Sequence, residues 1–216
     1  MSKIKICGLT RPCDIDFVNE AKPDFCGFIL GVPKSRRNIS LSTLYALRER
    51  LNASVKPVGV IVDAPMEMIL PLAADGTLAA IQLHGHESEE YILQLKEQTS
   101  VPIFRAFRVT DRESLIPALQ SPADLILLDH GAGGTGETFD WSVLEGITRP
   151  YILAGGLGPD NLESAISTLH PWGVDMSSGV ETDGIKDREK IFKAVQIAHK
   201  YVANHKQYIH LNRFAT

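Results

Sequence analysis

The stretch "KIKICGLTRPCDIDFVNEAK", residues 3–22, contains one complete repeat of the structural pattern that decides the fold. It begins with a short apolar run from Lys3 to Cys7, and a helical pattern follows around residues 14–21. A strand followed directly by a helix predicts a parallel sheet when the unit recurs along a chain.

The same unit recurs along the whole sequence. The expected strands are Lys3 to Cys7, Phe25 to Leu30, Pro57 to Asp63, Ala79 to His84, Ile103 to Val109, Asp124 to Asp129, Tyr151 to Ala154 and Gly173 to Ser177. The expected helices lie around 14–21, 41–52, 65–74, 88–98, 111–120, 141–147, 159–169 and 187–204. Helix start signals are found at Ser40 or Ser42, Ser88, Asp111 and Pro159.

Eight strand-then-helix units without an intervening linker predict an α/β fold, a (β/α)8 TIM barrel with an outer ring of helices. We expect a single domain over residues 1–216, in which 205–216 form a C-terminal extension of unknown role. A doubly wound open sheet is the alternative, because it uses the same units.

Composition narrows the classes of function. The 216 residues include 22 basic and 26 acidic side chains, a net charge of −4, which argues against nucleic acid and membrane as partners. No signal-like segment and no run of 18 apolar residues occurs, so we expect a cytoplasmic protein. Cys7, Cys13 and Cys26 lack C-x-x-C spacing and suggest neither a disulfide framework nor a zinc site.

In a TIM barrel the active site lies at the carboxyl ends of the strands. These ends carry Cys7, Asp63, His84, Asp129, Gly155 with Gly156, and Ser177 with Ser178. Alternation of side chains along each strand sends Lys5, Cys7, Gln82, His84, Asp175 and Ser177 into the barrel. Because the last strand closes onto the first, we expect Lys5 and Asp175 to form a buried ion pair. In the alternative, Lys5 reaches water at the base of the barrel.

Two side chains are candidates for proton transfer. Cys7, near a buried ammonium, is expected to have a lowered pKa and to act as a base or nucleophile, unless it is simply a core residue. Asp129 lies in an apolar funnel that could raise its pKa and make it a proton donor, although an Asp in this place often caps the next segment. Asp63 is interpreted as a helix cap with Pro65 in the first turn. Cys13 and Cys26 are interpreted as structural.

The remaining candidates are residues that could bind a substrate. "LAGGLGPDN" and "MSSGVE" follow the last two strands, where barrels often bind phosphate through backbone amides. "KSRRNIS" offers Lys34, Arg36 and Arg37 to hold a carboxylate, or simply forms a solvated face. His84 is interpreted as a hydrogen-bonding wall residue rather than a metal ligand or base.

The loop "GAGGTGET", residues 131–138, nearly matches the nucleotide-binding pattern G-x-x-x-x-G-K-[ST]. Glu137 stands where that pattern requires Lys, and its charge would repel a triphosphate. A nucleotide-binding module is therefore disfavoured, and we interpret the glycines as a hinge that permits the loop to close over a substrate.

The motifs "KICGLTR", "GFIL" with "PKSRRNIS", "VGVIVD", "IQLHG", "LLD" with "GGTGETFDW", "LAGGLGPDN" and "VDMSSGVETDGIKD" closely resemble the phosphoribosylanthranilate isomerase family. The resemblance runs from Lys3 to about Lys193 in the right order. It implies a single-domain (β/α)8 barrel without a metal or organic cofactor. We expect the protein to be a monomer or a homodimer. The implied reaction is the Amadori rearrangement of N-(5-phosphoribosyl)anthranilate in tryptophan biosynthesis.

The resemblance also implies roles for individual residues. Cys7 resembles the family's general base and Asp129 its general acid. Arg37 resembles the residue that holds the anthranilate carboxylate, although the family's common S-P-R is Ser35, Arg36, Arg37 here, so that Arg36 is a second candidate. Gly155, Gly156, Ser178 and Gly179 match the phosphate-binding turns, with His84 as a further binding residue and Lys5 and Asp175 as supporting residues.

Two other interpretations stay open at this point. The related histidine-pathway isomerase uses an aspartate where Cys7 stands, which argues against it. A barrel that has lost catalysis and serves as a scaffold is disfavoured because both presumed catalytic residues are present.

Overall fold

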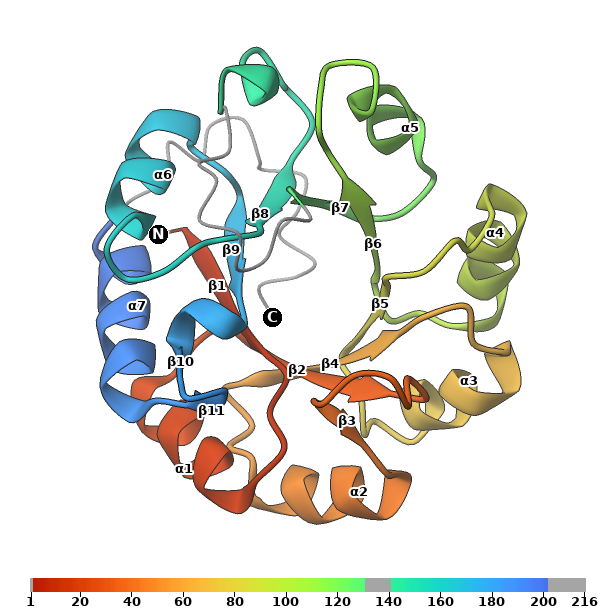
Figure 1. Cartoon of the computed structure of the whole chain (residues 1–216). Helices are drawn as coiled ribbons and strands as arrows, with labels where there is room; N and C mark the ends of the chain where they lie inside the picture. The colour runs from red at the N-terminus through yellow and green to blue at the C-terminus, as the bar shows by residue number, and fades with distance from the viewer. Residues whose placement is uncertain (1, 131–140, 202–216) are drawn as a thin grey trace.

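Eight parallel strands form a closed barrel in the computed structural model, which describes residues 2–130 and 141–201. The barrel strands are β1 (Lys3–Cys7), β2 (Phe25–Leu30), β4 (Lys56–Ile61), β5 (Ala80–Leu83), β6 (Ile103–Arg108), β7 (Leu125–Asp129), β8 (Tyr151–Ala154) and β9 (Gly173–Met176). Each strand pairs in parallel with its neighbours, and β1 pairs with both β2 and β9, which closes the ring (Figure 1). The predicted barrel is confirmed, and the open doubly wound sheet is wrong.

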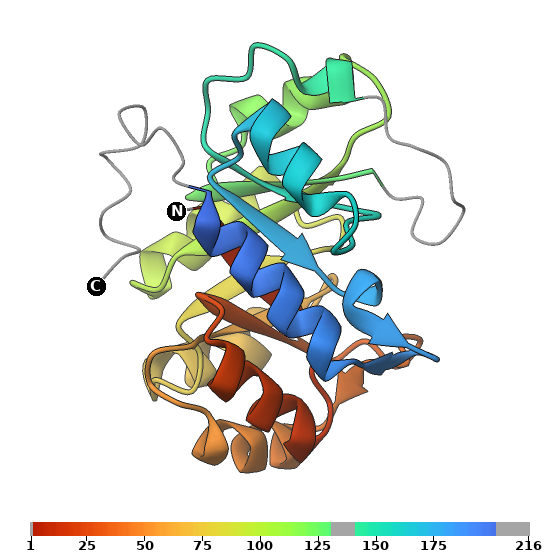
Figure 2. The same cartoon turned by 90° about the vertical axis from the view of Figure 1, so that its left-hand side faces the viewer.

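Seven α-helices surround the described barrel. They are α1 (Pro12–Ala21), α2 (Leu41–Arg50), α3 (Met66–Ala74), α4 (Glu89–Gln98), α5 (Leu115–Gln120), α6 (Leu162–Leu169) and α7 (Arg188–Lys200). Figure 2 shows α7 lying between α6 and α1, so that the C-terminal helix packs beside the N-terminal one. Ser40 and Ser88 are the predicted caps: the Ser40 Oγ accepts from the Thr43 N–H at 3.1 Å and the Ser88 Oγ from the Tyr91 N–H at 3.1 Å.

The apolar core has two parts. Residues such as Ile4 and Ile6 pack outward between the sheet and the helices, as the alternation predicts. The interior of the barrel holds a separate cluster that includes Phe25, Phe104 and Trp172, in which the two Phe rings meet edge to face at 5.9 Å. Because Phe25 opens its strand, this cluster fills the amino-terminal end of the barrel and leaves the carboxyl end for a cavity.

Several expected helices are shorter than the pattern predicts. Residues 141–147 form only a 3-10 helix, η1 (Trp141–Leu144), and α5 begins at Leu115 because Asp111 accepts from the Ser114 N–H in a turn. Pro159 is not in the first helical turn: α6 begins at Leu162, after a loop in which the Asn161 side chain accepts from the Gly158 N–H. α7 ends at Lys200. The expected continuation to 204 and the extension 205–216 lie outside the described residues.

Asp63 does not cap a helix, contrary to expectation. Its backbone has a positive φ of 48° and its carboxylate accepts from the His86 N–H, so it fixes the loop after β5, while Pro65 immediately precedes α3. Elements that were not predicted are β3 (Asn38–Ile39), the 3-10 helix η2 (Ser178–Val180) and the hairpin of β10 (Glu181–Thr182) with β11 (Ile185–Lys186).

Candidate active site

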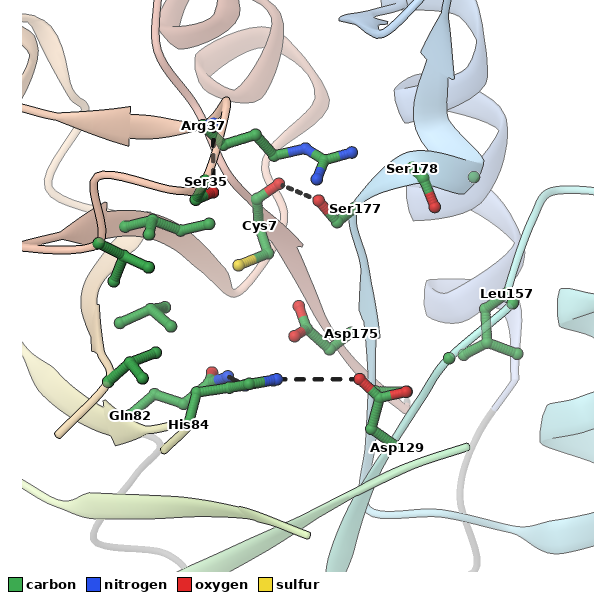
Figure 3. A pocket seen from close by; sticks show the side chains of 18 residues that line it. Cys7, Ser35, Arg37, Gln82, His84, Asp129, Leu157, Asp175, Ser177 and Ser178 are labelled. Carbon is green, nitrogen blue, oxygen red and sulfur yellow. Dashed lines mark hydrogen bonds and ion pairs between the residues drawn. The ribbon is translucent and has the colours of Figure 1, made fainter. Parts of the chain in front are cut away.

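A cavity of about 370 Å³ opens at the carboxyl ends of the strands, a size suited to a small molecule (Figure 3). It is lined by Cys7, Ile29, Val32, Ser35, Arg37, Val60, Val62, Gln82, His84, Asp129, Ala154, Gly155, Gly156, Leu157, Asp175, Ser177, Ser178 and Gly179. Nine of the ten residues expected at the site from the sequence line this cavity. The tenth, Lys5, does not line it and instead donates to the carboxylate of Asp175.

Lys5 and Asp175 form the buried ion pair predicted from the strand alternation. The Lys5 Nζ donates to both carboxylate oxygens of Asp175 at 3.0 Å, and Lys5 is 1% exposed. The pair joins β1 to β9, where the two residues are in register. The alternative in which Lys5 reaches water at the base of the barrel is therefore wrong. Burial would lower the pKa of Lys5, but the charges of Asp175 and Cys7 outweigh it and raise the pKa.

Cys7 ends β1 and presents its thiol to the cavity (Figure 3). Burial raises the pKa of Cys7, while Lys5 and Lys186 oppose this effect without overcoming it. The expected lowering of the pKa is thus wrong, because the loss of water around the sulfur exceeds the attraction of the neighbouring ammonium groups. The hydroxyl of Ser177 donates to the Cys7 carbonyl at 3.1 Å and ties the end of β1 to the segment after β9.

Gly27 leaves the space that the thiol occupies. A Cβ at this position would lie 2.7 Å from the Cys7 Sγ and 3.1 Å from the Lys5 Nζ. Both distances are too short for an unshifted side chain, so the absence of a side chain at residue 27 permits Lys5 and Cys7 to lie beside each other.

Asp129 ends β7 and faces His84 across the cavity (Figure 3). The His84 Nε2 lies 3.9 Å from the Asp129 Oδ2, and the other ring nitrogen is 3.0 Å from the Gln82 amide nitrogen. Burial lowers the pKa of His84, although Asp129 acts in the opposite direction, so the ring is predominantly neutral at pH 7. Gly155 has a φ of +87°, and a Cβ there would lie 2.6 Å from the Asp129 Oδ1. The glycine therefore leaves room for the carboxylate.

The two arginines of "KSRRNIS" differ in their relation to the cavity. Arg37 lines it, whereas the side chain of Arg36 is 60% exposed and Lys34 is exposed. Both guanidinium groups bind the buried carboxylate of Glu181. The hydrogen bonds that Arg37 donates to Glu181 raise the pKa of Arg37, so this side chain is a permanent cation at the cavity wall.

The loops after β8 and β9 meet at another part of the cavity wall. Gly155, Gly156, Ser178 and Gly179 all line the cavity, and both Gly155 and Gly156 have positive φ. A Cβ on Gly179 would lie 1.9 Å from the Leu157 carbonyl oxygen, so only glycine allows the two loops to approach this closely. Backbone amides on glycine turns beside the start of η2 form the kind of surface that binds phosphate.

Sequence reasoning missed Glu181, which accepts hydrogen bonds from Arg37, and Lys186, which binds Glu181. The Lys186 Nζ donates to the Glu181 Oε1 at 2.6 Å, and the two residues are paired across the β10–β11 hairpin. A signal was present, because Asp183 and Gly184 form the Asp-Gly pair typical of a tight hairpin and both have positive φ.

Within residues 2–130 and 141–201, no group of three or more His, Cys, Asp or Glu is arranged to hold a metal ion. In the same part of the chain, no helix is long and apolar enough to cross a membrane. Cys26 is fully buried among the residues between sheet and helices, and Cys13 is half-buried on α1. The expected loop hinge and Glu137 lie outside the described residues.

The closed (β/α)8 barrel and the cavity at the carboxyl ends of its strands define the class, a barrel enzyme whose site takes a small molecule. The model of the family "N-(5'phosphoribosyl)anthranilate (PRA) isomerase" matches residues 4–197. The chain belongs to this family and is an isomerase, which confirms the resemblance drawn from its motifs.

Individual relatives agree with this membership. An N-(5'-phosphoribosyl)anthranilate isomerase from Endomicrobium trichonymphae is 43% identical over 201 residues, which are 91% of this chain and 98% of the relative. A crystal structure of a PRA isomerase in complex with reduced 1-(o-carboxyphenylamino)-1-deoxyribulose 5-phosphate is 35% identical, with a TM-score of 0.82 over 93% of this chain and all of that one. Monomers generated from the dimeric Thermotoga maritima enzyme are 36% identical, with a TM-score of 0.81 over the same shares.

Proposed function

We propose that the protein catalyses the Amadori rearrangement of N-(5'-phosphoribosyl)anthranilate to 1-(o-carboxyphenylamino)-1-deoxyribulose 5-phosphate in tryptophan biosynthesis, with Cys7 as the general base and Asp129 as the general acid. One observation carries the assignment of roles: a thiol and a carboxylate line the same cavity from β1 and β7, together with an arginine and a pair of glycine turns. The strands β8 and β9 separate β1 from β7, so the two groups face a bound molecule from different sides.

The two ends of the substrate carry negative charge, and the cavity offers a partner to each. The glycine turns at Gly155, Gly156, Ser178 and Gly179 suit the phosphate, and Arg37 suits the anthranilate carboxylate. Binding at both ends orients the sugar between them and provides the effective concentration that proton transfer requires. Arg37 is preferred to Arg36 because it lines the cavity.

The reaction needs one acid and one base. Asp129 gives a proton to the furanose ring oxygen while the bond from that oxygen to C1 breaks, and the nitrogen lone pair forms the C1=N bond of a Schiff base. The Cys7 thiolate then removes the proton from C2, which yields an enolamine. Transfer of the hydroxyl proton at C2 and protonation at C1 complete the ketone. Electrons are redistributed only within the substrate, so the scheme is a net isomerisation.

The surroundings of Cys7 suit a base. A thiol whose pKa is raised by burial is a stronger base once it is ionised, and Lys5 and Lys186 stabilise the thiolate that must form. His84, neutral because burial lowers its pKa, lies beside Asp129 as a hydrogen-bonding partner rather than as a competing acid.

The activity is tested by mixing the purified full chain with N-(5'-phosphoribosyl)anthranilate and following the loss of the fluorescent substrate. The matched control is the aldose substrate of the related histidine-pathway isomerase. We expect turnover of the first compound and little or none of the second. Turnover of the histidine-pathway compound alone would overturn the proposal.

The catalytic roles are tested by substitution. Cys7→Ala and Asp129→Asn should each lower kcat by at least about 100-fold, because general acid and base catalysis typically contribute that much or more. Cys26→Ala is the control, since this fully buried cysteine packs toward the helices and should leave kcat within about twofold. Wild-type kcat in either site variant contradicts the role given to that residue.

Subunit state and location complete the proposal. All the residues to which the proposal gives a role in catalysis or binding are found in a single copy of the chain, whether the enzyme is a monomer or a homodimer. Sedimentation equilibrium distinguishes the two. We place the enzyme in the cytoplasm, where a phosphorylated substrate is retained, and cell fractionation with an epitope-tagged chain tests this.

A further inference from the structure

We propose that Glu181 is a positioning residue, which fixes the guanidinium of Arg37 so that one edge of it faces the substrate carboxylate. The inference rests on the proposed function, because it concerns how the carboxylate subsite is built. Glu181 itself is not among the residues that line the cavity, so it would act through Arg37 rather than on the substrate.

The geometry around Glu181 is a two-pronged clamp. The Arg37 Nε donates to the Oε1 at 2.7 Å and the Arg37 Nη2 donates to the Oε2 at 2.7 Å. Glu181 as a whole residue is 8% exposed, so water competes little for the hydrogen bonds of its carboxylate. A long, flexible arginine is thereby held in one orientation.

The clamp occupies the Nε–Nη2 edge of the guanidinium. The edge formed by Nη1 and Nη2 points elsewhere, and a planar guanidinium can bind a second carboxylate there. The aliphatic part of the Arg37 side chain passes close to Gly8, since a Cβ on Gly8 would lie 2.4 Å from the Arg37 Cδ. Gly8 directly follows Cys7 and has a φ of +79°, so the chain itself makes room for this path.

Glu181 is held in turn from its own hairpin. The Lys186 Nζ donates to the Glu181 Oε1 and, at 3.0 Å, to the carbonyl of Ser177. The Lys190 Nζ donates to the Glu181 backbone carbonyl at 2.7 Å. The carboxylate of Glu181 is therefore anchored to β11 through Lys186, which also binds the segment that follows β9, and the Glu181 backbone is anchored to α7 through Lys190. An ordinary surface ion pair is not fixed by this many hydrogen bonds. The anchoring of Glu181 therefore fits a residue that holds Arg37 in a defined position.

A purely electrostatic role of Glu181 and a positioning role predict opposite effects of its removal on the binding of an anion. Burial would raise the pKa of Glu181, but the hydrogen bonds of Arg37 and Lys186 hold it below its usual range, so the group is ionised at neutral pH. Arg36, Arg37 and Lys186 share this single carboxylate. Its removal would make the wall more positive, and simple Coulomb attraction would then strengthen the binding of an anion. If Glu181 instead fixes the orientation of the Arg37 guanidinium, its removal would weaken the binding of the anion.

The test measures binding to Glu181→Gln by titration calorimetry. The probes are reduced 1-(o-carboxyphenylamino)-1-deoxyribulose 5-phosphate and the same compound without its carboxylate. In the wild type the carboxylate should strengthen binding by at least about tenfold, as a charge-assisted pair typically does. In Glu181→Gln we expect this carboxylate preference to fall by about tenfold, with the compound that lacks the carboxylate bound as before.

Asp183→Asn is the matched control. It removes the same charge from the exposed turn of the same hairpin, and Asn tolerates the positive φ of 53° found there. The carboxylate preference should stay within about twofold of wild type. If Glu181→Gln fails to fold, as judged by its thermal transition, Glu181→Asp replaces it. The shorter side chain keeps the charge and should also lose the preference, because it cannot span both donors of Arg37.

The outcomes separate the two proposals. An unchanged or increased carboxylate preference in Glu181→Gln overturns the positioning role and leaves the proposed reaction intact. Equal weakening of both probes also overturns it, since that result marks a merely structural residue. No carboxylate preference in the wild type overturns both the role of Arg37 and this inference. Absence of turnover in the wild type with a preserved preference contradicts only the proposed reaction.

Discussion

The surroundings of Cys7 have opposing effects on the pKa of its thiol. Burial raises its pKa while two ammonium groups lower it, and burial has the larger effect. The alternation of side chains along β1 was sufficient to predict that Lys5 and Cys7 share a face of the strand. It was not sufficient to predict the direction of the pKa shift, because the loss of water depends on strands that lie far away in the sequence, such as β2 and β9.

The raised pKa predicts how Cys7 reacts with pH. Because the pKa lies above the ordinary 9.0, the thiolate is the minor form at neutral pH and its fraction rises about tenfold for each unit of pH below the pKa. Alkylation of Cys7 by iodoacetamide, followed by peptide mass spectrometry, should therefore accelerate steadily from pH 7 to about 9. The fully buried Cys26 is the internal control and should stay unlabelled. A plateau below pH 8 would show a lowered pKa instead.

Gly27→Ala should damage catalysis by displacing the thiol. The added Cβ would meet the Cys7 Sγ at 2.7 Å, and we expect kcat to fall by about tenfold or more, with a loss of stability of about 1–3 kcal/mol from overpacking. Gly59→Ala on the neighbouring strand is the control, since its Cβ would meet Leu78 at 2.5 Å on the helix side. This variant should lose comparable stability and keep its kcat. Equal kcat in the two variants would contradict the prediction.

At the scale of elements, hydrophobic pattern predicted the strands better than the helices. The strands are short and buried on both sides, so continuous apolar runs identify them. The short helices α5 and α6 begin late because Asp111, Ser114 and Asn161 offer side-chain acceptors to nearby backbone groups and favour turns. The hairpin β10–β11 was missed because each of its strands has only two residues, too few to show any period.

Ser40 fixes the start of α2 and thereby the end of the loop that carries Arg37. Ser40→Ala removes the acceptor of the Thr43 N–H and should lower the free energy of unfolding by about 1 kcal/mol, measured in urea. Ser42→Ala is the control: among the described residues the Ser42 hydroxyl hydrogen-bonds only to the Ser40 hydroxyl, and the change should be within about 0.5 kcal/mol. Equal losses in both variants would show that Ser40 does not act as a cap.

At the scale of the whole molecule, the Lys5–Asp175 pair joins the first and last strands of the barrel. Lys5→Met would leave the Asp175 carboxylate without its partner, and we expect a loss of about 3–5 kcal/mol in urea unfolding. Adding Asp175→Leu should restore much of this stability. Lys3→Met on the same strand is the control, because its pair with Asp24 is partly exposed and should contribute about 1 kcal/mol or less. A similar loss from both lysines would contradict a special role for the buried pair.

The closure of β1 onto β9 has a consequence for the order in which the protein becomes functional during translation. The thiol and both arginines leave the ribosome early, but Asp175, Glu181 and Lys186 are synthesised near the end of the chain. The carbonyl of Cys7 receives its hydrogen bond from Ser177, and Arg37 receives its anchor from Glu181, only after those residues emerge. A nascent chain that stops before β9 therefore carries the Cys7 thiol without the groups that organise its surroundings, and we expect enzymatic competence only after the segment that follows β9 has emerged.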